Sequence, residues 1–233
     1  MNKLLAIETS SEACSVALSI DGEVREAHEV APLKHAEILL PAVSRLLGEA
    51  GIPVSALDVI AFGRGPGSFT SLRIGIGVVQ GLAWAAGLPV VPCSSLAVVA
   101  QAALDRQVAG RADGPTERVC VAVDARMNEV FCGEFERGSG GLVHAAGEER
   151  VCAPGAVPKP TAGPFVAAGN GFARYPDLAS LGAAAIACHA DLWPRASVIA
   201  RLALAWLTDH EPLPAAQAQP VYIRNNVAEK PSP

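Results

Sequence analysis

The chain has 233 residues, of which 51% are hydrophobic, so it is long and apolar enough for one large or two small domains with a substantial core. Its net charge of −5 argues against a protein that binds nucleic acid by itself, because neutralising phosphates requires a basic surface. Aromatic residues make up only 5% of the chain, so there are too few to form a surface on which the bases of single-stranded nucleic acid stack.

The sequence favours a cytoplasmic location without a membrane span. Residues 1–8 do not read as a signal peptide, since their apolar run stops at Glu8 and no small-residue cleavage site follows. The long apolar window at residues 74–92 contains four glycines, which indicates a buried helix followed by a strand. The six cysteines form no C-x-x-C pair and are typical of reduced, packed thiols.

The first half of the chain has a clear pattern of strands and helices. A hairpin signal at Asp21-Gly22 joins the second and third of three strands, which are predicted at residues 3–7, 13–20 and 23–29. Helical spacing follows at residues 35–50, where Pro41 is expected to kink the helix or move its start. Strands and helices then alternate at residues 57–62, 70–86, 88–92 and 94–104. This order predicts an α/β domain whose mixed five-stranded sheet has helices on both faces.

A polar, glycine-rich segment at residues 107–117 predicts a domain boundary. We therefore divide the chain into a first domain, 1–106, and a second domain, 107–233, whose C-terminal segment packs back on the first. The second half has a weaker pattern, with strands at 118–124, 128–136, within 142–152 and at 165–168, a helix at 197–208 and a tail at 221–226.

Residues 63–73 contain a glycine-rich loop between a predicted strand and a predicted helix. Such a loop can hold an anion or phosphate at the amino end of the helix, although it can equally be a tight turn without a ligand. Its spacing matches neither a P-loop nor a strict dinucleotide fingerprint. The polar turn that begins at Glu8 can likewise be either a phosphate-binding turn or an ordinary polar turn without a ligand. Any nucleotide is expected to contact Thr9, Ser10, Gly65, Gly67 and Ser68.

The helix predicted at residues 70–86 has small residues on one face. Gly77, Gly81 and Ala85 are spaced four apart, and each helical glycine costs about 1 kcal/mol relative to alanine. We infer that another backbone packs very close to this face, either the protein's own sheet or a helix of another chain. A neighbouring apolar ridge would need a partner if it is exposed, and consists of Leu72, Ile76, Val79 and Ala83.

Motifs for catalysis and metal binding are missing from the sequence. The five histidines have no metal-ligand spacing, so no metal site is expected, and His35 is the one histidine we would test. No G-x-S-x-G elbow occurs. Asp124, Arg126 and Glu129 are grouped at a predicted hairpin, and we interpret them as a solvated turn with local ion pairs rather than catalytic residues.

Four segments together resemble the bacterial TsaB (YeaZ) family over nearly the whole chain, namely LAIETS at residues 5–10, GRGPGSFTSLRIG at 63–75, VDARMNEV at 123–130 and PVYIRN at 220–225. The resemblance implies a duplicated fold of the actin/Hsp70/sugar-kinase (ribonuclease-H-like) type with a reduced second domain. It also implies a role in forming the threonylcarbamoyl modification of adenosine 37 in tRNA.

The catalytic relative in that family, TsaD, carries a histidine-based metal site, whereas the corresponding residues 91–96 contain no histidine here. The resemblance therefore favours a non-catalytic scaffold that binds and stabilises TsaD, with the TsaE ATPase as a further partner and tRNA reached only through the complex. It implies a homodimer when TsaD is absent, no tightly bound cofactor, and ATP or ADP at most at the complex interface. The expected contact residues are Leu72, Ile74, Gly77, Val78, Gly81, Leu82, Ala85, His35, Leu39 and Leu46.

The rival interpretation is an enzyme that acts by itself, an ATP-binding kinase-like or carbamoyl-transferring protein. This alternative predicts tight ATP binding by the isolated chain, lost when Thr9 or Gly67 is changed. A peptidase ranks last, because the sequence contains no recognisable pair of nucleophile and base.

Overall fold

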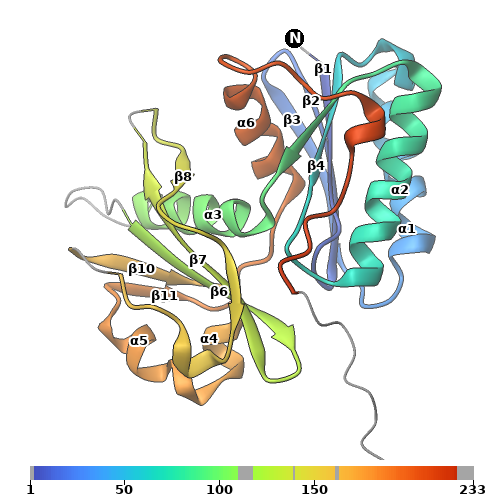
Figure 1. Ribbon diagram of the computed structural model, residues 1–233. Helices are drawn as coiled ribbons and strands as arrows, with labels where there is room; N and C mark the ends of the chain where they lie inside the picture. The colour runs from blue at the N-terminus through green and yellow to red at the C-terminus, as the bar shows by residue number, and fades with distance from the viewer. Residues whose placement is uncertain (1–2, 110–117, 139, 161–162, 225–233) are drawn as a thin grey trace, which may run out of the picture.

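The computed structural model describes residues 3–109, 118–138, 140–160 and 163–224, and in it the chain forms two lobes that are each built on one β-sheet (Figure 1). The first sheet has the strand order β3-β2-β1-β4-β5. Strands β1 to β3 are antiparallel, while β4 and β5 continue parallel to β1. The bounds are β1 (Lys3–Glu8), β2 (Ala13–Ile20), β3 (Glu23–Val30), β4 (Val59–Gly63) and β5 (Val90–Cys93).

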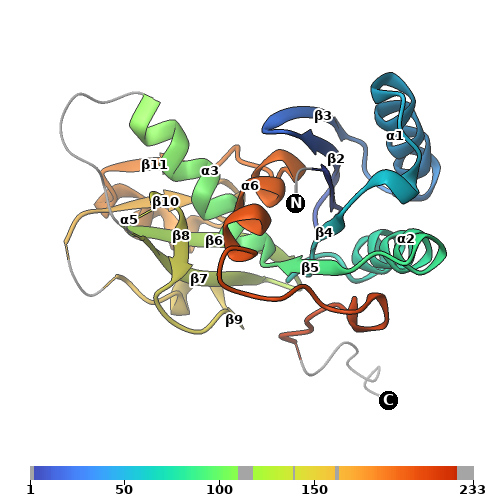
Figure 2. The ribbon, with the colours of Figure 1, turned by 90° about the horizontal axis from the view of Figure 1, so that it is seen from above.

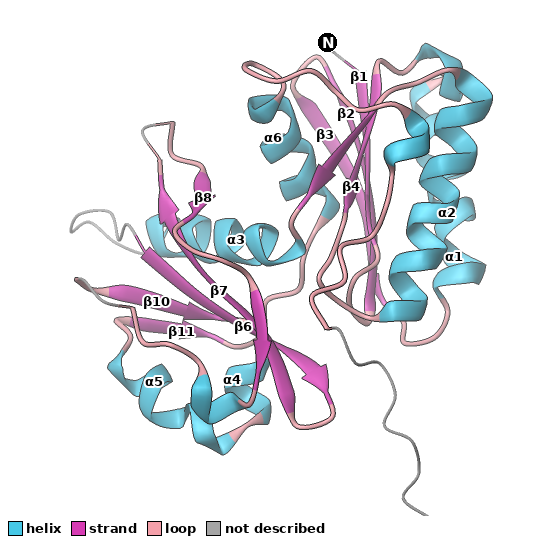
Figure 3. Cartoon of the chain, in the orientation of Figure 1, coloured by secondary structure: helices cyan, strands magenta, loops and turns pink. Residues whose placement is uncertain are grey.

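Helices cover both faces of the first sheet because its central strands are apolar on both sides. In β1, Leu5 and Ile7 pack on the side of α1 (His35–Ala50) and α2 (Phe69–Ala86). The alternate residues Leu4 and Ala6 face α6 (Ala196–Trp206) on the other side. Figure 3 shows this arrangement, with α1 and α2 on one side of the strands and α6 on the other.

The second sheet repeats the topology of the first. It has the order β11-β10-β6-β7-β8, with antiparallel β6, β7 and β8 and parallel β6, β10 and β11. The lobe is reduced, because the short strand β9 and a connector stand where the first lobe has α1. The bounds are β6 (Arg118–Arg126), β7 (Glu129–Arg137), β8 (Val143–Ala145), β9 (Arg150–Cys152), β10 (Phe165–Ala168), β11 (Ala187–His189), α4 (Gly171–Arg174) and α5 (Ala179–Ala184).

Each lobe contributes the helix that packs against the other lobe. Helix α3 (Ser95–Ala109) follows β5 of the first sheet but packs through Leu96 and Val99 on Val119 and Phe135 of the second. Helix α6 follows β11 of the second sheet and packs on the first. The two helices lie side by side between the sheets (Figure 2). The division after residue 106 stays a prediction, although α3, which it assigned to the first domain, packs on the second sheet. Residues 110–117 of the predicted boundary lie outside the described residues.

The predicted elements of residues 3–104 are all present, with ends that differ by up to five residues. Helix α1 begins at His35 with Pro41 inside it, so the proline does not move the start. The predicted strand within 142–152 is two short strands, β8 and β9. The structure also contains the short elements β11, α4 and α5, which no sequence pattern predicts. All six cysteines are free thiols, as expected.

Residues 213–224, which we call the C-terminal strap, run along the first lobe next to β5 and α2 (Figure 1). Leu213 exchanges two backbone hydrogen bonds with Val90 of β5, at 2.7 and 2.8 Å. Farther along, the Gln80 side chain of α2 donates to the carbonyl of Ala218 at 2.7 Å. Residues 225 and 226 of the predicted tail lie outside the described residues.

Helix α2 is the one helix among the described residues that is long and apolar enough to cross a membrane. Its ridge of Leu72, Ile76, Val79 and Ala83 is buried within the first lobe. The ridge therefore needs no partner from another chain, since the protein's own core covers it. Helix α2 thus packs on the first lobe through this ridge, while most of its other residues are not fully buried.

Candidate functional site

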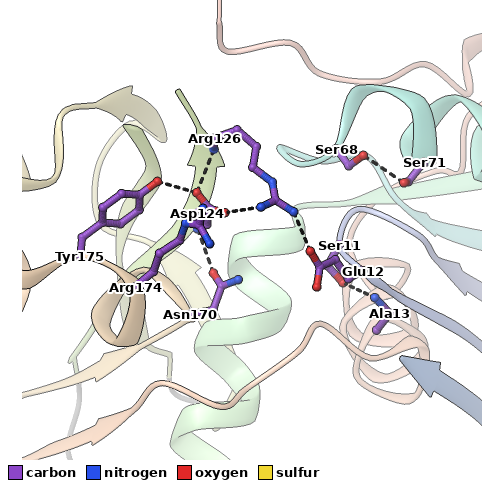
Figure 4. A network of polar contacts seen from close by, with 10 residues as sticks. All are labelled: Ser11, Glu12, Ala13, Ser68, Ser71, Asp124, Arg126, Asn170, Arg174 and Tyr175. Carbon is purple, nitrogen blue, oxygen red and sulfur yellow. Dashed lines mark hydrogen bonds and ion pairs between the residues drawn. The ribbon is translucent and has the colours of Figure 1, made fainter. Parts of the chain in front are cut away.

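A cleft of about 610 Å³ lies between the two lobes. The first lobe contributes the turn between β1 and β2 and the start of α2, while the second lobe contributes the tip of the β6–β7 hairpin and Asn170. The last residues of the C-terminal strap, Val221 to Arg224, complete the lining. Segments that are far apart in the sequence thus meet at one place, which is shown in part in Figure 4.

Asp124 is the centre of a polar network on the second-lobe side of the cleft (Figure 4). Its carboxylate accepts hydrogen bonds from the Tyr175 hydroxyl at 2.6 Å and the Arg126 backbone at 2.9 Å, and an ion pair with Arg174 spans 3.3 Å. Its own backbone N–H donates to Asn170 at 2.8 Å. Burial and the contact with Asp124 raise the pKa of Tyr175. The expected local ion pair with Arg126 is present and the tip is exposed at Arg126 and Met127, whereas the Asp124 side chain is only 6% exposed.

Two sets of contacts join the lobes beside this network. Arg126 forms an exposed ion pair with Glu12 of the β1–β2 turn at 2.6 Å, a type of contact that contributes little stability by itself. Glu149, in the loop before β9, accepts a hydrogen bond from Ser94 and lies 3.7 Å from Arg64 of the glycine loop. Burial raises the pKa of Glu149.

The glycine loop is packed tightly against the first lobe. A Cβ atom at Gly67 would lie less than 3 Å from the backbone carbonyl of Ser10, and the Ser68 N–H donates to that carbonyl at 2.7 Å. Thr9 fills the space in front of Gly75. Close packing thus accounts for these glycines without a ligand. Of the residues expected to contact a nucleotide, Ser10, Gly67 and Ser68 line the cleft, whereas Thr9 and Gly65 do not.

Glu8 is a buried carboxylate at the end of β1, with no exposed surface. It accepts hydrogen bonds from the Ser10 backbone at 2.6 Å and the Ser95 hydroxyl at 2.8 Å. Gly63 makes room for it, because a Cβ there would collide with the carboxylate. Burial raises the pKa of Glu8 and the hydrogen bonds from Ser10 and Ser95 only partly offset this effect.

The Glu8→Gln variant is expected to gain stability relative to the wild type as the pH rises. The folded protein binds the Glu8 proton more tightly than the unfolded chain, whose pKa is near 4.5, so ionisation weakens the fold above that value. Urea unfolding of both proteins at about pH 5 and about pH 8 measures the difference in unfolding free energy. The Glu12→Gln change at the exposed neighbouring position is the control. A difference between wild type and Glu8→Gln that stays constant with pH would contradict the expectation.

Two of the three glycines of α2, Gly77 and Gly81, face solvent, whereas Gly75 is buried against Thr9. In the described part of the chain, a Cβ at Gly77 or at Gly81 would have no atom within 4 Å beyond its own stretch of helix. Trp84, which no sequence motif marks, is 77% exposed on the same helix. The prediction that this face packs on the protein's own sheet is therefore wrong.

The remaining predicted contact residues differ in their exposure. Ala85 is exposed, while Ile74, Val78 and Leu82 are half-buried. Four others are buried and offer little side-chain surface to a partner, namely Leu72, His35, Leu39 and Leu46.

His35 is packed inside the first lobe. Its Nε2 lies 3.3 Å from the carbonyl oxygen of Ala13, within hydrogen-bond distance, and the side chain is buried. No group of three or more histidine, cysteine, aspartate or glutamate side chains in the described part of the chain is placed to hold a metal ion.

Two lobes that repeat one topology around a cleft place the chain in the actin-like and sugar-kinase-like class of α/β proteins. A model of the TsaD family, described as tRNA N6-adenosine threonylcarbamoyltransferase, matches residues 27–231. The tRNA threonylcarbamoyladenosine biosynthesis protein TsaB of Escherichia coli (strain K12) is 38% identical over 99% of this chain and 98% of its own length. The TsaB protein of Haemophilus influenzae is 36% identical over 99% of this chain and 97% of its own.

A solved structure, YeaZ from Pseudomonas aeruginosa, superposes with a TM-score of 0.84 at 43% identity, covering 95% of this chain and 100% of that one. The chain belongs to the TsaB (YeaZ) family and takes part in tRNA threonylcarbamoyladenosine biosynthesis.

Proposed function

We propose that this protein is a non-catalytic subunit that binds and stabilises TsaD through the exposed face of α2. The observation that supports this most is the open space at Gly77 and Gly81. Each glycine weakens the helix by about 1 kcal/mol, and no contact with the described residues compensates for the loss. A partner helix that lies directly on the α2 backbone explains both glycines, and the exposed Trp84 next to them is a suitable anchor.

The state of the carboxylates near the cleft supports a role without catalysis. Glu8 is fully buried and bonded to Ser10 and Ser95. Asp124 is occupied by Tyr175, Arg126 and Arg174. A general base needs a free acceptor within reach of its substrate. The carboxylates of Glu8 and Asp124 are instead engaged in hydrogen bonds and ion pairs within the protein.

The other members of the assembly follow from the same proposal. Without TsaD, two copies of this chain pair through the α2 face as a homodimer. The TsaE ATPase joins the complex, with ATP or ADP bound at an interface between subunits rather than tightly by this chain. Because the chain carries a net charge of −5, it meets tRNA only through the complex, in the cytoplasm.

Light scattering of the purified chain, alone and mixed with TsaD from the same organism, tests the proposal. We expect a homodimer that is converted to a 1:1 complex when TsaD is added. If no complex forms and the chain alone turns over ATP, the scaffold role is wrong and the enzyme alternative takes its place.

The alternative of an ATP-binding, kinase-like or carbamoyl-transferring enzyme rests on the cleft, whose volume suits a small ligand and which Ser10, Gly67 and Ser68 line. Calorimetric titration with Mg²⁺-ATP separates the two proposals. The scaffold predicts no tight binding by the isolated chain. The enzyme predicts tight binding that Ser10→Ala and Ser68→Ala weaken.

A further inference from the structure

The tip of the β6–β7 hairpin has an unusual backbone. Arg126, Met127 and Asn128 have φ angles of +61°, +54° and +56°, so three successive residues other than glycine adopt the left-handed conformation. Residues with a side chain seldom adopt this conformation, and then mostly singly. Surrounding contacts must hold such a tip in one arrangement, and within the hairpin the Arg126 N–H donates to Asp124.

Arg224 at the end of the C-terminal strap supplies such contacts. Its guanidinium donates to the carbonyl of Ala125 at 3.1 Å and to that of Arg126 at 3.5 Å, and it forms an ion pair with Glu129. The other terminal nitrogen lies 3.5 Å from the sulfur of Met127. One side chain, only 17% exposed, thus touches both arms of the turn from a position some hundred residues away in the chain.

The strap itself is anchored on α2. Tyr222, two residues before Arg224, accepts a hydrogen bond from Arg73 at 2.9 Å, and its ring centroid lies 5.4 Å from that of Phe69. The Arg73 guanidinium also lies over the Phe69 ring at 3.6 Å. A continuous series of contacts therefore runs from α2 through the strap to the hairpin tip.

We propose that Arg224 is a positioning residue that clamps the β6–β7 tip and thereby fixes the second-lobe wall of the cleft relative to α2. The tip carries Asp124, Arg126 and Met127 into the cleft lining, so its conformation decides the shape of the cleft. An arginine suits this position because its two terminal nitrogens spread over the tip, one at the carbonyls and Glu129 and the other at the Met127 sulfur, whereas a lysine ammonium is a single point charge. Clamping is a property of the isolated chain and holds whether or not α2 binds TsaD.

Hydrogen exchange of the full-length chain, followed by mass spectrometry, tests the clamp. In Arg224→Met, we expect the amides of residues 124–130 to exchange about tenfold faster, with unchanged protection in β1 and β4. Arg224→Lys should give an intermediate rate, because it retains the charge near Glu129 but not the fork. Glu129→Gln should reproduce part of the effect.

Arg201→Met is the matched control, since Arg201 of α6 forms an ion pair with Asp105 of α3, another contact between the lobes. It should leave exchange at residues 124–130 unchanged. The proposal is overturned if Arg224→Met leaves the tip unaltered, or if exchange rises equally in both sheets, which would indicate general destabilisation rather than a clamp.

Discussion

The change Gly81→Leu is expected to abolish assembly with TsaD and to leave a folded monomer. The Cβ of a leucine at this exposed position would meet no described residue, and the change should stabilise α2 by up to about 1 kcal/mol. On the proposed interface it would instead hold a partner helix away, with a loss of roughly thirtyfold or more in affinity, as for a hot-spot residue. Calorimetry with TsaD and thermal unfolding of the free chain measure the two effects separately.

The matched control is Gly48→Leu in helix α1. Gly48 is also a helical glycine, a Cβ atom there would meet no other atom within 4 Å, and it is not one of the predicted contact residues. The leucine should change stability in the same direction as in Gly81→Leu and leave TsaD binding intact. Normal assembly of Gly81→Leu would place the interface elsewhere on the molecule.

Gly67→Ala is expected to destabilise the fold by about 3 kcal/mol, because the added methyl group meets the Ser10 backbone rather than a mobile side chain. For a chain of this size the unfolding midpoint should fall by about 10 °C. The loss should appear without any nucleotide present, since close packing of the loop is the reason for the glycine. Thermal and urea unfolding measure it.

Gly77→Ala is the control for this prediction, because the same methyl group enters open space on α2 and should be neutral or stabilising. If Gly67→Ala is as stable as the wild type but alters nucleotide binding, the loop is a phosphate cradle after all, and the enzyme alternative gains support.

Local sequence patterns predict the first lobe well because its strands and helices are long and its turns carry clear signals. The face of α2 that packs on the sheet is harder to predict. Helical spacing separates the face of Gly77 and Gly81 from the ridge of Leu72 and Ile76, but both faces are apolar or small. Periodicity alone therefore cannot decide which one packs on the sheet, and the structure shows that the ridge does.

The polar network at the cleft depends on contacts between residues that are distant in sequence. Tyr175 and Arg174 reach Asp124 across about fifty residues, and no local pattern marks them. The burial of Glu8 likewise follows from Ser95 and Gly63, which lie on other elements. Arg224 lies in a segment that the family resemblance includes, but its contact with the hairpin tip becomes visible only in the folded chain.

The C-terminal strap also bears on solubility, because it covers one of the two open edges of the first sheet. Leu213 pairs with Val90 of β5 and so occupies the edge where a foreign strand could add. The opposite edge, β3, is rich in charge, with Glu23, Arg25, Glu26 and Glu29 along its eight residues. Charged edges resist the strand-by-strand addition that produces aggregates. A chain truncated before residue 213 would lose only the first of these protections, and it would expose an apolar strand to its own copies.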